Sequence, residues 1–117
     1  MTQDPLQQLT LRLRDFVAER EWEQFHTSKN LAMAITGEAG ELAAEFQWLS
    51  PDECKHLDPE RLERVKQEAA DVLLYLARLA DVLGFDLMEA ANQKIDINAT
   101  KYPAEKVRGS AKKYTEL

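Results

Sequence analysis

The sequence predicts an all-α protein with a fold like a four-helix bundle. Of its 117 residues 44% are hydrophobic and 31% are charged, with only four glycines and four prolines, a composition typical of an ordered helical chain. Apolar residues recur at spacings of three and four, and capping residues precede the runs. This length suits one domain with its own core. We place that domain at residues 1–103 and expect residues 104–117 to form a loosely ordered tail.

Local signals bound the first two helices. Asp4 can cap a helix in which Pro5 takes the first position, and this helix should run to about residue 21. The second helix should begin near Thr27 or Ser28 and run to about residue 49. One face of the first helix is apolar and consists of Leu6, Leu9, Leu13, Phe16 and Val17.

The remaining helices have equally clear limits. The stretch Ser50–Glu53 has the pattern of a capping box and predicts a short connecting helix. Asp58 and Pro59 predict the start of a third long helix, which Gly84 should end in the left-handed conformation. The stretch Asp86–Glu89 is a further capping-box pattern, and the fourth helix should end before Pro103.

Charge and composition exclude several classes of partner. A net charge of −6 weighs against nucleic acid, which needs clustered Lys and Arg. The single cysteine, Cys54, forms no internal disulfide, and the N-terminal residues lack the basic start and apolar segment of a signal peptide. No apolar run approaches the roughly 20 residues that span a bilayer. We therefore expect a cytoplasmic protein without a membrane partner.

Acidic residues interrupt the apolar face of the second helix in the stretch GEAGELAAEF. At about 100° per residue, Glu38 falls within the apolar stripe and Glu41 at its edge. Burying an ionised carboxylate without compensation costs several kcal/mol. Since no Lys or Arg lies between Asn30 and Cys54, the helix itself offers no ion pair. These acids need a partner from elsewhere.

The third helix offers a second pair of acids, Glu68 and Asp71, beside its own apolar stripe. If the two helices pack antiparallel, four carboxylates converge, and a hard divalent cation such as Mg²⁺ or Mn²⁺ would relieve their repulsion. A structural reading stays open, because Arg64 lies one turn before Glu68 and allows an ion pair there.

Three segments, GEAGELAAEFQWL, EAADVLLYLARLA and KIDINATKYP, resemble the MazG-like all-α nucleoside triphosphate pyrophosphohydrolases, and most closely their dCTP pyrophosphatase branch. The resemblance covers about residues 22–113. It implies a MazG-type fold, a homo-oligomer (a dimer or a pair of dimers) and a Mg²⁺-dependent enzyme that converts dCTP or a modified dCTP to the monophosphate and pyrophosphate, as in sanitation of the nucleotide pool. It also implies that the metal-binding and catalytic residues are Glu38, Glu41, Glu68 and Asp71. Glu45 would support these ligands or position water.

The resemblance also assigns residues to the nucleotide. Lys94, Asn98 and Lys101 share one helical face, where they could grip phosphate oxygens or the sugar, with Tyr102 beside them. Flat aromatic faces suit a base, and polar groups could read its edge. The residues expected around the base are Trp22, His26, Asn30, Trp48 and Tyr75. The plainer interpretation is that the aromatic residues are core and that the fourth-helix residues are a solvated face.

Two other functions compete with this one. One is a helical oligomerisation or interaction module without enzymatic activity, whose acids serve solubility or ion pairing. The other is a pyrophosphatase of broad specificity for dNTPs. Neither the phosphorus that is attacked nor the acid that accepts a proton follows from the residues, although the position of Glu41 at the edge of the stripe favours it as the base.

Overall fold

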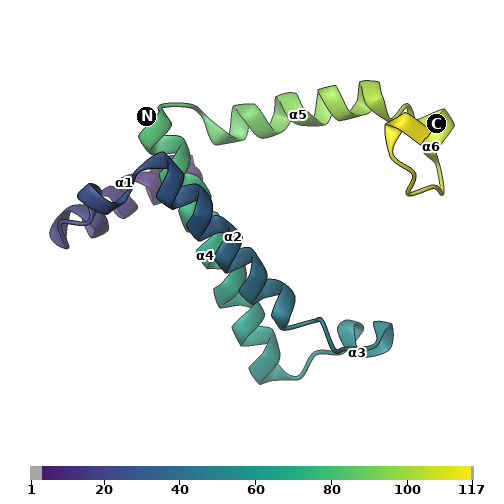
Figure 1. Cartoon of the computed structure of the whole chain (residues 1–117), viewed down its shortest axis with the longest axis horizontal. Coiled ribbons are helices and arrows are strands. Elements are labelled where there is room, and N and C mark those ends of the chain that lie inside the picture. Colours follow the sequence, from purple (N-terminus) through teal and green to yellow (C-terminus); the bar gives the residue numbers. More distant parts are fainter. Residues whose placement is uncertain (1–3, 117) are drawn as a thin grey trace. The chain divides into compact units, whose positions relative to one another are not determined.

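The computed structural model describes residues 4–116, apart from the side chain of Tyr114, and this part of the chain is helical without strands (Figure 1). The all-α prediction is therefore confirmed. No helix among the described residues is long and apolar enough to cross a membrane. The helices are α1 Pro5–Glu19, η1 Glu23–Phe25, α2 Ser28–Ala44, α3 Pro51–Lys55, α4 Pro59–Leu83, α5 Leu87–Lys101, α6 Ala104–Val107 and η2 Tyr114–Glu116.

The helices begin where side chains can satisfy their first backbone N–H groups. Asp4, Thr27, Ser50 and Asp58 each accept a hydrogen bond from the N–H three residues ahead. Ser50 forms the complete capping box that the sequence predicts. Such a cap stabilises a helix by about 1 kcal/mol. At the other end of α4, Gly84 takes the left-handed conformation with φ 77°.

Two helix ends fall earlier than expected. Glu21 has a positive φ of 54°, and α1 ends at Glu19. The helix α2 ends at Ala44 instead of residue 49. The backbone N–H groups of Glu45 and Phe46 bond the carbonyl groups three residues before them, as in a 3₁₀ turn. The carbonyl oxygen of Glu45 accepts a hydrogen bond from the Arg61 guanidinium of α4.

The start of α5 forms only one of the two hydrogen bonds of a capping box. Asp86 accepts a hydrogen bond from the Glu89 N–H, as the sequence predicts. The carboxylate of Glu89 accepts instead from Gln93, at 3.1 Å, so the reciprocal half of the capping box is missing.

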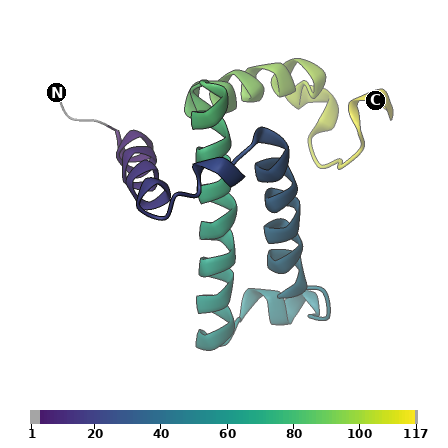
Figure 2. The same cartoon turned by 60° about the vertical axis from the view of Figure 1, so that its left-hand side comes forward.

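In the first compact unit, α1 and α2 pack against α4. The helices α2 and α4 lie side by side and run antiparallel, joined through α3 (Figure 2), and α1 also contacts α4. The buried hydrophobic residues are Val17 of α1, Leu31 of α2, and Ala77 and Ala80 of α4. Short alanine side chains allow close approach to a long helix. This packing brings the two acidic helix faces together.

The chain divides into two compact units, Met1–Gly84 and Phe85–Leu117. The second unit holds α5, α6 and η2. The predicted limit of the domain at residue 103 and the loosely ordered tail beyond it stay predictions, although residues 104–107 and 114–116 form short helices.

Candidate active site

Three carboxylates meet between α2 and α4. Glu38 and Glu41 lie one turn apart on α2, and Glu68 lies on α4, which runs antiparallel beside it. One oxygen of each carboxylate lies within 4.8 Å of the other two. Glu38 and Glu68 are half-buried and Glu41 is exposed. The structure thus brings together three of the four acids that the sequence predicts as metal ligands.

Two of the three acids, Glu38 and Glu68, have a raised pKa. Burial, followed by the hydrogen bond and charge of Glu41, raises the pKa of Glu38. For Glu68 the hydrogen bond with Glu41 comes first, burial second, and together with the neighbouring charges they raise its pKa as well. The cluster therefore favours binding of a positive charge, either a proton or a cation.

Two oxygen atoms in this cluster lack a protein partner. The Oε2 atoms of Glu38 and Glu68 are buried, and neither has a hydrogen bond to any residue in the described part of the chain. Buried polar atoms are seldom left in this state. A set of carboxylate oxygens without nitrogen or sulfur is the donor chemistry that Mg²⁺ and Mn²⁺ prefer. The residues present therefore fit a hard divalent cation.

Asp71 stands slightly apart from the other three acids. It lies one turn beyond Glu68 on α4 and is half-buried, and its charge contributes to the raised pKa of both Glu38 and Glu68. Its carboxylate is not among the three whose oxygens converge. Asp71 instead lines a neighbouring cavity, so it connects the acid cluster with that cavity.

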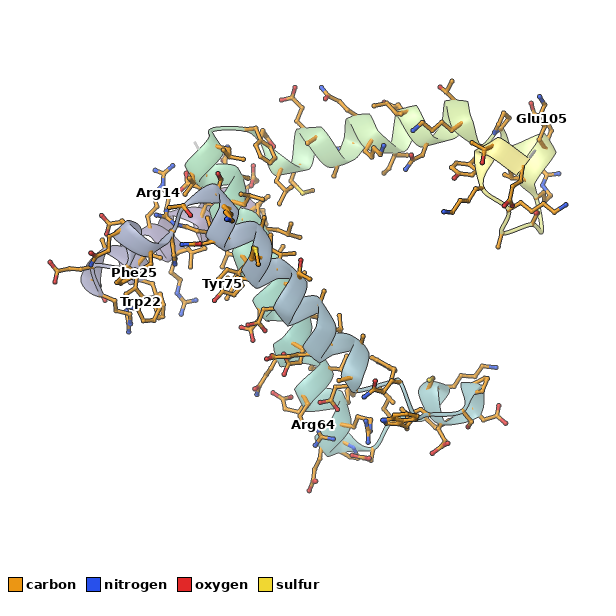
Figure 3. All side chains as sticks on the ribbon, in the orientation of Figure 1. Arg14, Trp22, Phe25, Arg64, Tyr75 and Glu105 are labelled. Atoms are coloured by element: carbon orange, nitrogen blue, oxygen red, sulfur yellow. The ribbon has the colours of Figure 1, made fainter. Side chains whose placement is uncertain are left out.

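A cavity of about 200 Å³ lies between α1, the residues on either side of η1, and α4. Trp22 and Tyr75, labelled in Figure 3, belong to its wall, and the Trp22 ring meets that of Phe16 edge-on at 5.8 Å between centroids. The lining residues are Leu13, Phe16, Val17, Trp22, His26, Asp71, Leu74, Tyr75 and Arg78. Three residues predicted to surround a base, Trp22, His26 and Tyr75, thus share one cavity with a predicted metal ligand.

Two other predicted base-binding residues lie elsewhere. Trp48 is 87% exposed and is not part of the cavity wall. The Asn30 side chain donates to the carbonyl oxygen of Phe25 at 3.0 Å, which ties η1 to the start of α2. The predicted phosphate-binding residues belong to the second unit, where α5 carries Lys94, Asn98 and Lys101 and is capped by Tyr102. Their role stays a prediction.

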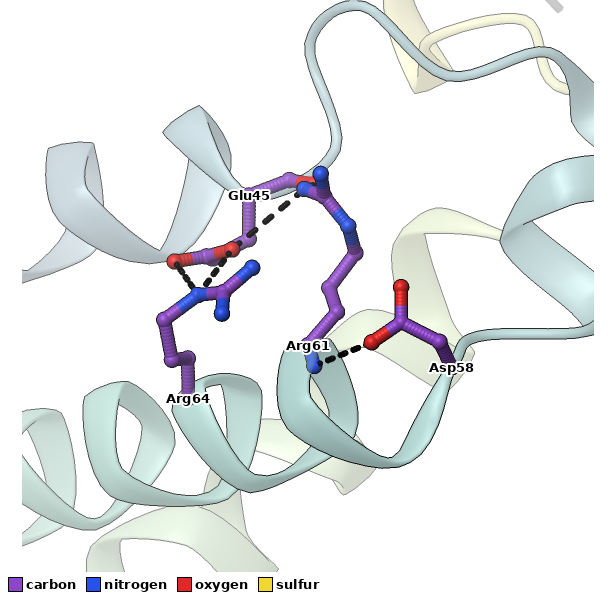
Figure 4. A network of polar contacts seen from close by, with 4 residues as sticks. All are labelled: Glu45, Asp58, Arg61 and Arg64. Atoms are coloured by element: carbon purple, nitrogen blue, oxygen red, sulfur yellow. Dashed lines mark hydrogen bonds and ion pairs between the residues drawn. The ribbon is translucent and has the colours of Figure 1, made fainter.

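Glu45, expected to support the metal ligands or position water, forms ion pairs with two arginines of α4. Its carboxylate accepts from Arg64 Nε at 3.1 Å through both oxygens, and Arg61 approaches it at 3.3 Å (Figure 4). Arg61 is itself held at the start of α4, where its N–H donates to Asp58. The sequence allowed an ion pair between Arg64 and Glu68, but Arg64 pairs with Glu45 instead.

The hydrogen bonds among the polar residues in and next to the cavity wall were not predicted from the sequence. Arg78 donates to Nδ1 of His26 at 3.1 Å and contacts Asp81, which also binds Arg14 of α1. One signal was available, since Asp71, Tyr75 and Arg78 follow one another at spacings of four and three and so share a helix face. The partners Arg14 and His26 are distant in sequence and carry no such signal.

Both histidines follow a glutamate by three residues, the spacing that di-iron helical bundles use. These pairs are Glu23 with His26 and Glu53 with His56. Within the described residues, neither histidine is part of the cluster of side chains that could hold a metal ion. The cluster between α2 and α4 therefore offers oxygen ligands alone.

Comparison with known proteins identifies the family of this chain. The model of the MazG-like family matches residues 33–117, which include the acid cluster. The chain belongs to the MazG-like family. It is 46% identical over 105 residues to dCTP pyrophosphatase 1 of Homo sapiens and to that of Mus musculus. These alignments cover 88% of this chain, which spans 62% of the length of each relative. The resemblance drawn from the three sequence segments is confirmed.

A solved structure has the same fold as this chain. The crystal structure of a pyrophosphatase from Archaeoglobus fulgidus superimposes with a TM-score of 0.82 at 39% sequence identity. The match covers 88% of this chain and 96% of the other. The helical arrangement around the acid cluster is therefore one that a solved pyrophosphatase also adopts.

Proposed function

We propose that this protein is a Mg²⁺-dependent nucleoside triphosphate pyrophosphohydrolase that converts a dNTP, foremost dCTP or a modified dCTP, to the monophosphate and pyrophosphate. The observation that carries the proposal is the pair of buried Oε2 atoms on Glu38 and Glu68, which lack protein partners beside the cavity. Its relatives named dCTP pyrophosphatase 1 support the choice of substrate.

The acids would hold the cation, and one of them would accept the proton of the attacking water. Glu38, Glu41 and Glu68 would bind the ion, and Asp71 would complete the set from the cavity side. When bound, Mg²⁺ supplies charge neutralisation for the phosphate oxygens and lowers the pKa of a water molecule. Glu41 is the exposed member of the three converging acids, so it is the best placed to accept a proton.

The cavity would hold the base. A volume of about 200 Å³ is smaller than pockets that enclose whole drug-sized ligands, so it suits one ring and not an entire nucleotide. Trp22 and Tyr75 provide aromatic surface, and His26 provides a polar group in the same wall. Lys94, Asn98, Lys101 and Tyr102 are the proposed phosphate and sugar ligands, on the strength of their spacing and of the family resemblance.

We also propose that the protein is a homo-oligomer, either a dimer or a pair of dimers. Large apolar side chains are exposed in the single chain, among them Met33 at 65% and Leu83 at 57%. Exposed apolar surface of this kind is typical of subunit interfaces. Trp48, at 87% exposure, is a further side chain that a second subunit or the nucleotide would cover.

Release of pyrophosphate tests the proposed reaction. The assay compares the four dNTPs, the four NTPs and 5-modified dCTP analogues, each with Mg²⁺ and with a chelator. Release that requires Mg²⁺ and is fastest with dCTP or its analogues supports the proposal, and similar rates across all dNTPs favour the broad-specificity alternative. Glu38→Gln should abolish activity, whereas Glu60→Gln, which alters an exposed acid in the first turn of α4, should not.

The non-enzymatic alternative predicts a different result. A folded protein that hydrolyses no nucleotide, and whose thermal stability does not respond to Mg²⁺, would leave the acids with a structural role. In that case Glu38→Gln should only stabilise the fold, because it removes like-charge repulsion.

A further inference from the structure

A chain of hydrogen bonds reaches the cavity wall and ends on His26. The Nε atom of Arg78 donates to Nδ1 of His26 at 3.1 Å, and both residues line the cavity. The Arg78 side chain is only 12% exposed. This contact joins α4 to the segment between η1 and α2, at residues 52 positions apart in the sequence.

Arg78 determines which ring nitrogen of His26 carries the proton. A guanidinium has five donors and no acceptor, so Nδ1 of His26 must accept and cannot be protonated. A neutral imidazole then has its single proton on Nε2. No residue in the described part of the chain accepts a hydrogen bond from that Nε2, which leaves its N–H available to a ligand.

Arg78 is in turn held in place by Asp81. The Arg78 guanidinium lies 3.3 Å from Oδ2 of Asp81, which accepts from Arg14 Nε at 2.8 Å, and Arg14 also reaches Oδ1 at 2.5 Å. Because Asp81 is three residues after Arg78 on α4 and Arg14 comes from α1, the contacts restrain the guanidinium from two helices. The arrangement resembles the partners that fix the orientation of a functional histidine in other sites.

The surroundings of His26 also favour its neutral form. Burial is the largest cause that lowers the pKa of His26, the charge of Arg78 is the next, and Glu23 opposes them. The other ionisable groups that line the cavity are Asp71 and Tyr75. A neutral histidine can donate one directed hydrogen bond from Nε2 without adding a second positive charge to that of Arg78 in the cavity wall.

We propose that Arg78 is a positioning residue that fixes His26 in the Nε2–H tautomer, so that the cavity presents a hydrogen-bond donor to the acceptor edge of a base. The tautomer itself follows from the contact between the two residues. Only the identity of the ligand, a base with a carbonyl oxygen or an unprotonated ring nitrogen, rests on the proposed function.

The tautomer can be measured in the full-length protein by long-range ¹H–¹⁵N correlation spectra of the two imidazoles. We expect His26 to show a protonated Nε2 and an unprotonated Nδ1 near neutral pH. His56 is an internal reference, because its Nδ1 faces the carbonyl oxygen of Asp52 at 3.2 Å and must donate. A protonated Nδ1 on His26, or a mixture of tautomers, would overturn the proposal without any variant.

Substitution then tests whether Arg78 is the cause. Arg78→Met keeps an unbranched side chain that reaches about as far as Nε and removes every donor, so His26 should become a mixture of tautomers with a higher pKa. Arg12→Met is the matched control, because Arg12 is exposed on α1. If the His26 signals of Arg78→Met match those of the control, Arg78 does not position the ring.

Kinetics provide the functional readout. Loss of one neutral hydrogen bond to the base should raise KM for dCTP about tenfold and leave kcat nearly unchanged, since the contact is the same in the ground state and the transition state. An unchanged KM would refute the role in base recognition. If the unaltered protein hydrolyses no nucleotide, the proposed function fails, and the spectra alone still decide whether Arg78 positions His26.

Discussion

Replacing Asp81 with Asn would test the ion pairs that join α1 to α4. Asp81 accepts two hydrogen bonds from Arg14 and one from Arg78. Asparagine keeps one acceptor, but it loses the charge and turns an amide N–H toward one of the guanidinium groups. The variant should therefore fold with lower stability and hold Arg78 less firmly.

The size of the effect follows from the exposure of the three side chains. Asp81 and Arg78 are 13% and 12% exposed, whereas Arg14 is 54% exposed. Breaking a buried ion pair costs about 3–5 kcal/mol, and an exposed pair contributes about 0–1 kcal/mol. For this mixed case we expect a loss of about 2 kcal/mol in the free energy of unfolding. At roughly 4 °C per kcal/mol for a domain of this size, Tm should fall by about 8 °C.

Thermal melting followed by circular dichroism measures this loss, with Asp15→Asn as the control, because Asp15 is an exposed acid on the same helix as Arg14. The hydrogen bond from Arg14 is the largest cause that lowers the pKa of Asp81 below its ordinary value of 3.8. The stabilisation is therefore present above pH 3.8 and is lost as pH falls through the lower pKa of the folded state. A variant as stable as the control, or a stability difference that does not decrease as pH falls below 3.8, would refute the reasoning.

Four further predictions concern the acid cluster, the ion pairs of Glu45 and the core. Because burial and Glu41 raise the pKa of Glu38, the metal-free protein should lose stability as pH rises from 4.5 through that raised pKa, and Glu38→Gln should weaken this loss in melting curves recorded with a chelator. Mg²⁺ at 100 times its Kd should stabilise the unaltered protein by about 2.7 kcal/mol but have little effect on Glu38→Gln, and equal responses would argue against the site. Glu45→Gln should retain the response to Mg²⁺ and lose roughly 1 kcal/mol in urea unfolding, because its carboxylate pairs with two arginines of α4 and is not among the three converging acids. Leu31→Ala should cost about 3 kcal/mol in the same assay, since Leu31 is 1% exposed, and a loss below about 1 kcal/mol would contradict its place in the core.

Features that depend on neighbours in the sequence could be predicted well. The caps at Asp4, Thr27, Ser50 and Asp58 and the left-handed Gly84 all lie where the sequence places them, because each is decided within a few residues of the chain. The acids were recognisable for a similar reason, since helical periodicity alone places Glu38 on an apolar face.

Features that depend on distant residues could not be predicted. The early end of α2 and the pairing of Glu45 both depend on arginines of α4, sixteen and nineteen residues further along the chain. A guanidinium can reach several partners, and the packing of α2 against α4 selects among them. The ion pairs of Glu45 could not be predicted for this reason.

The sequence by itself determined the helices, most of their limits and the acidic character of the face between α2 and α4. Only the tertiary structure decided that three acids converge while Asp71 lines a cavity, and that Arg14, Asp81, Arg78 and His26 form one chain of contacts. The physical reason is that helical periodicity specifies the direction of a side chain from its own helix. Which side chains meet depends on how helices distant in sequence pack against one another.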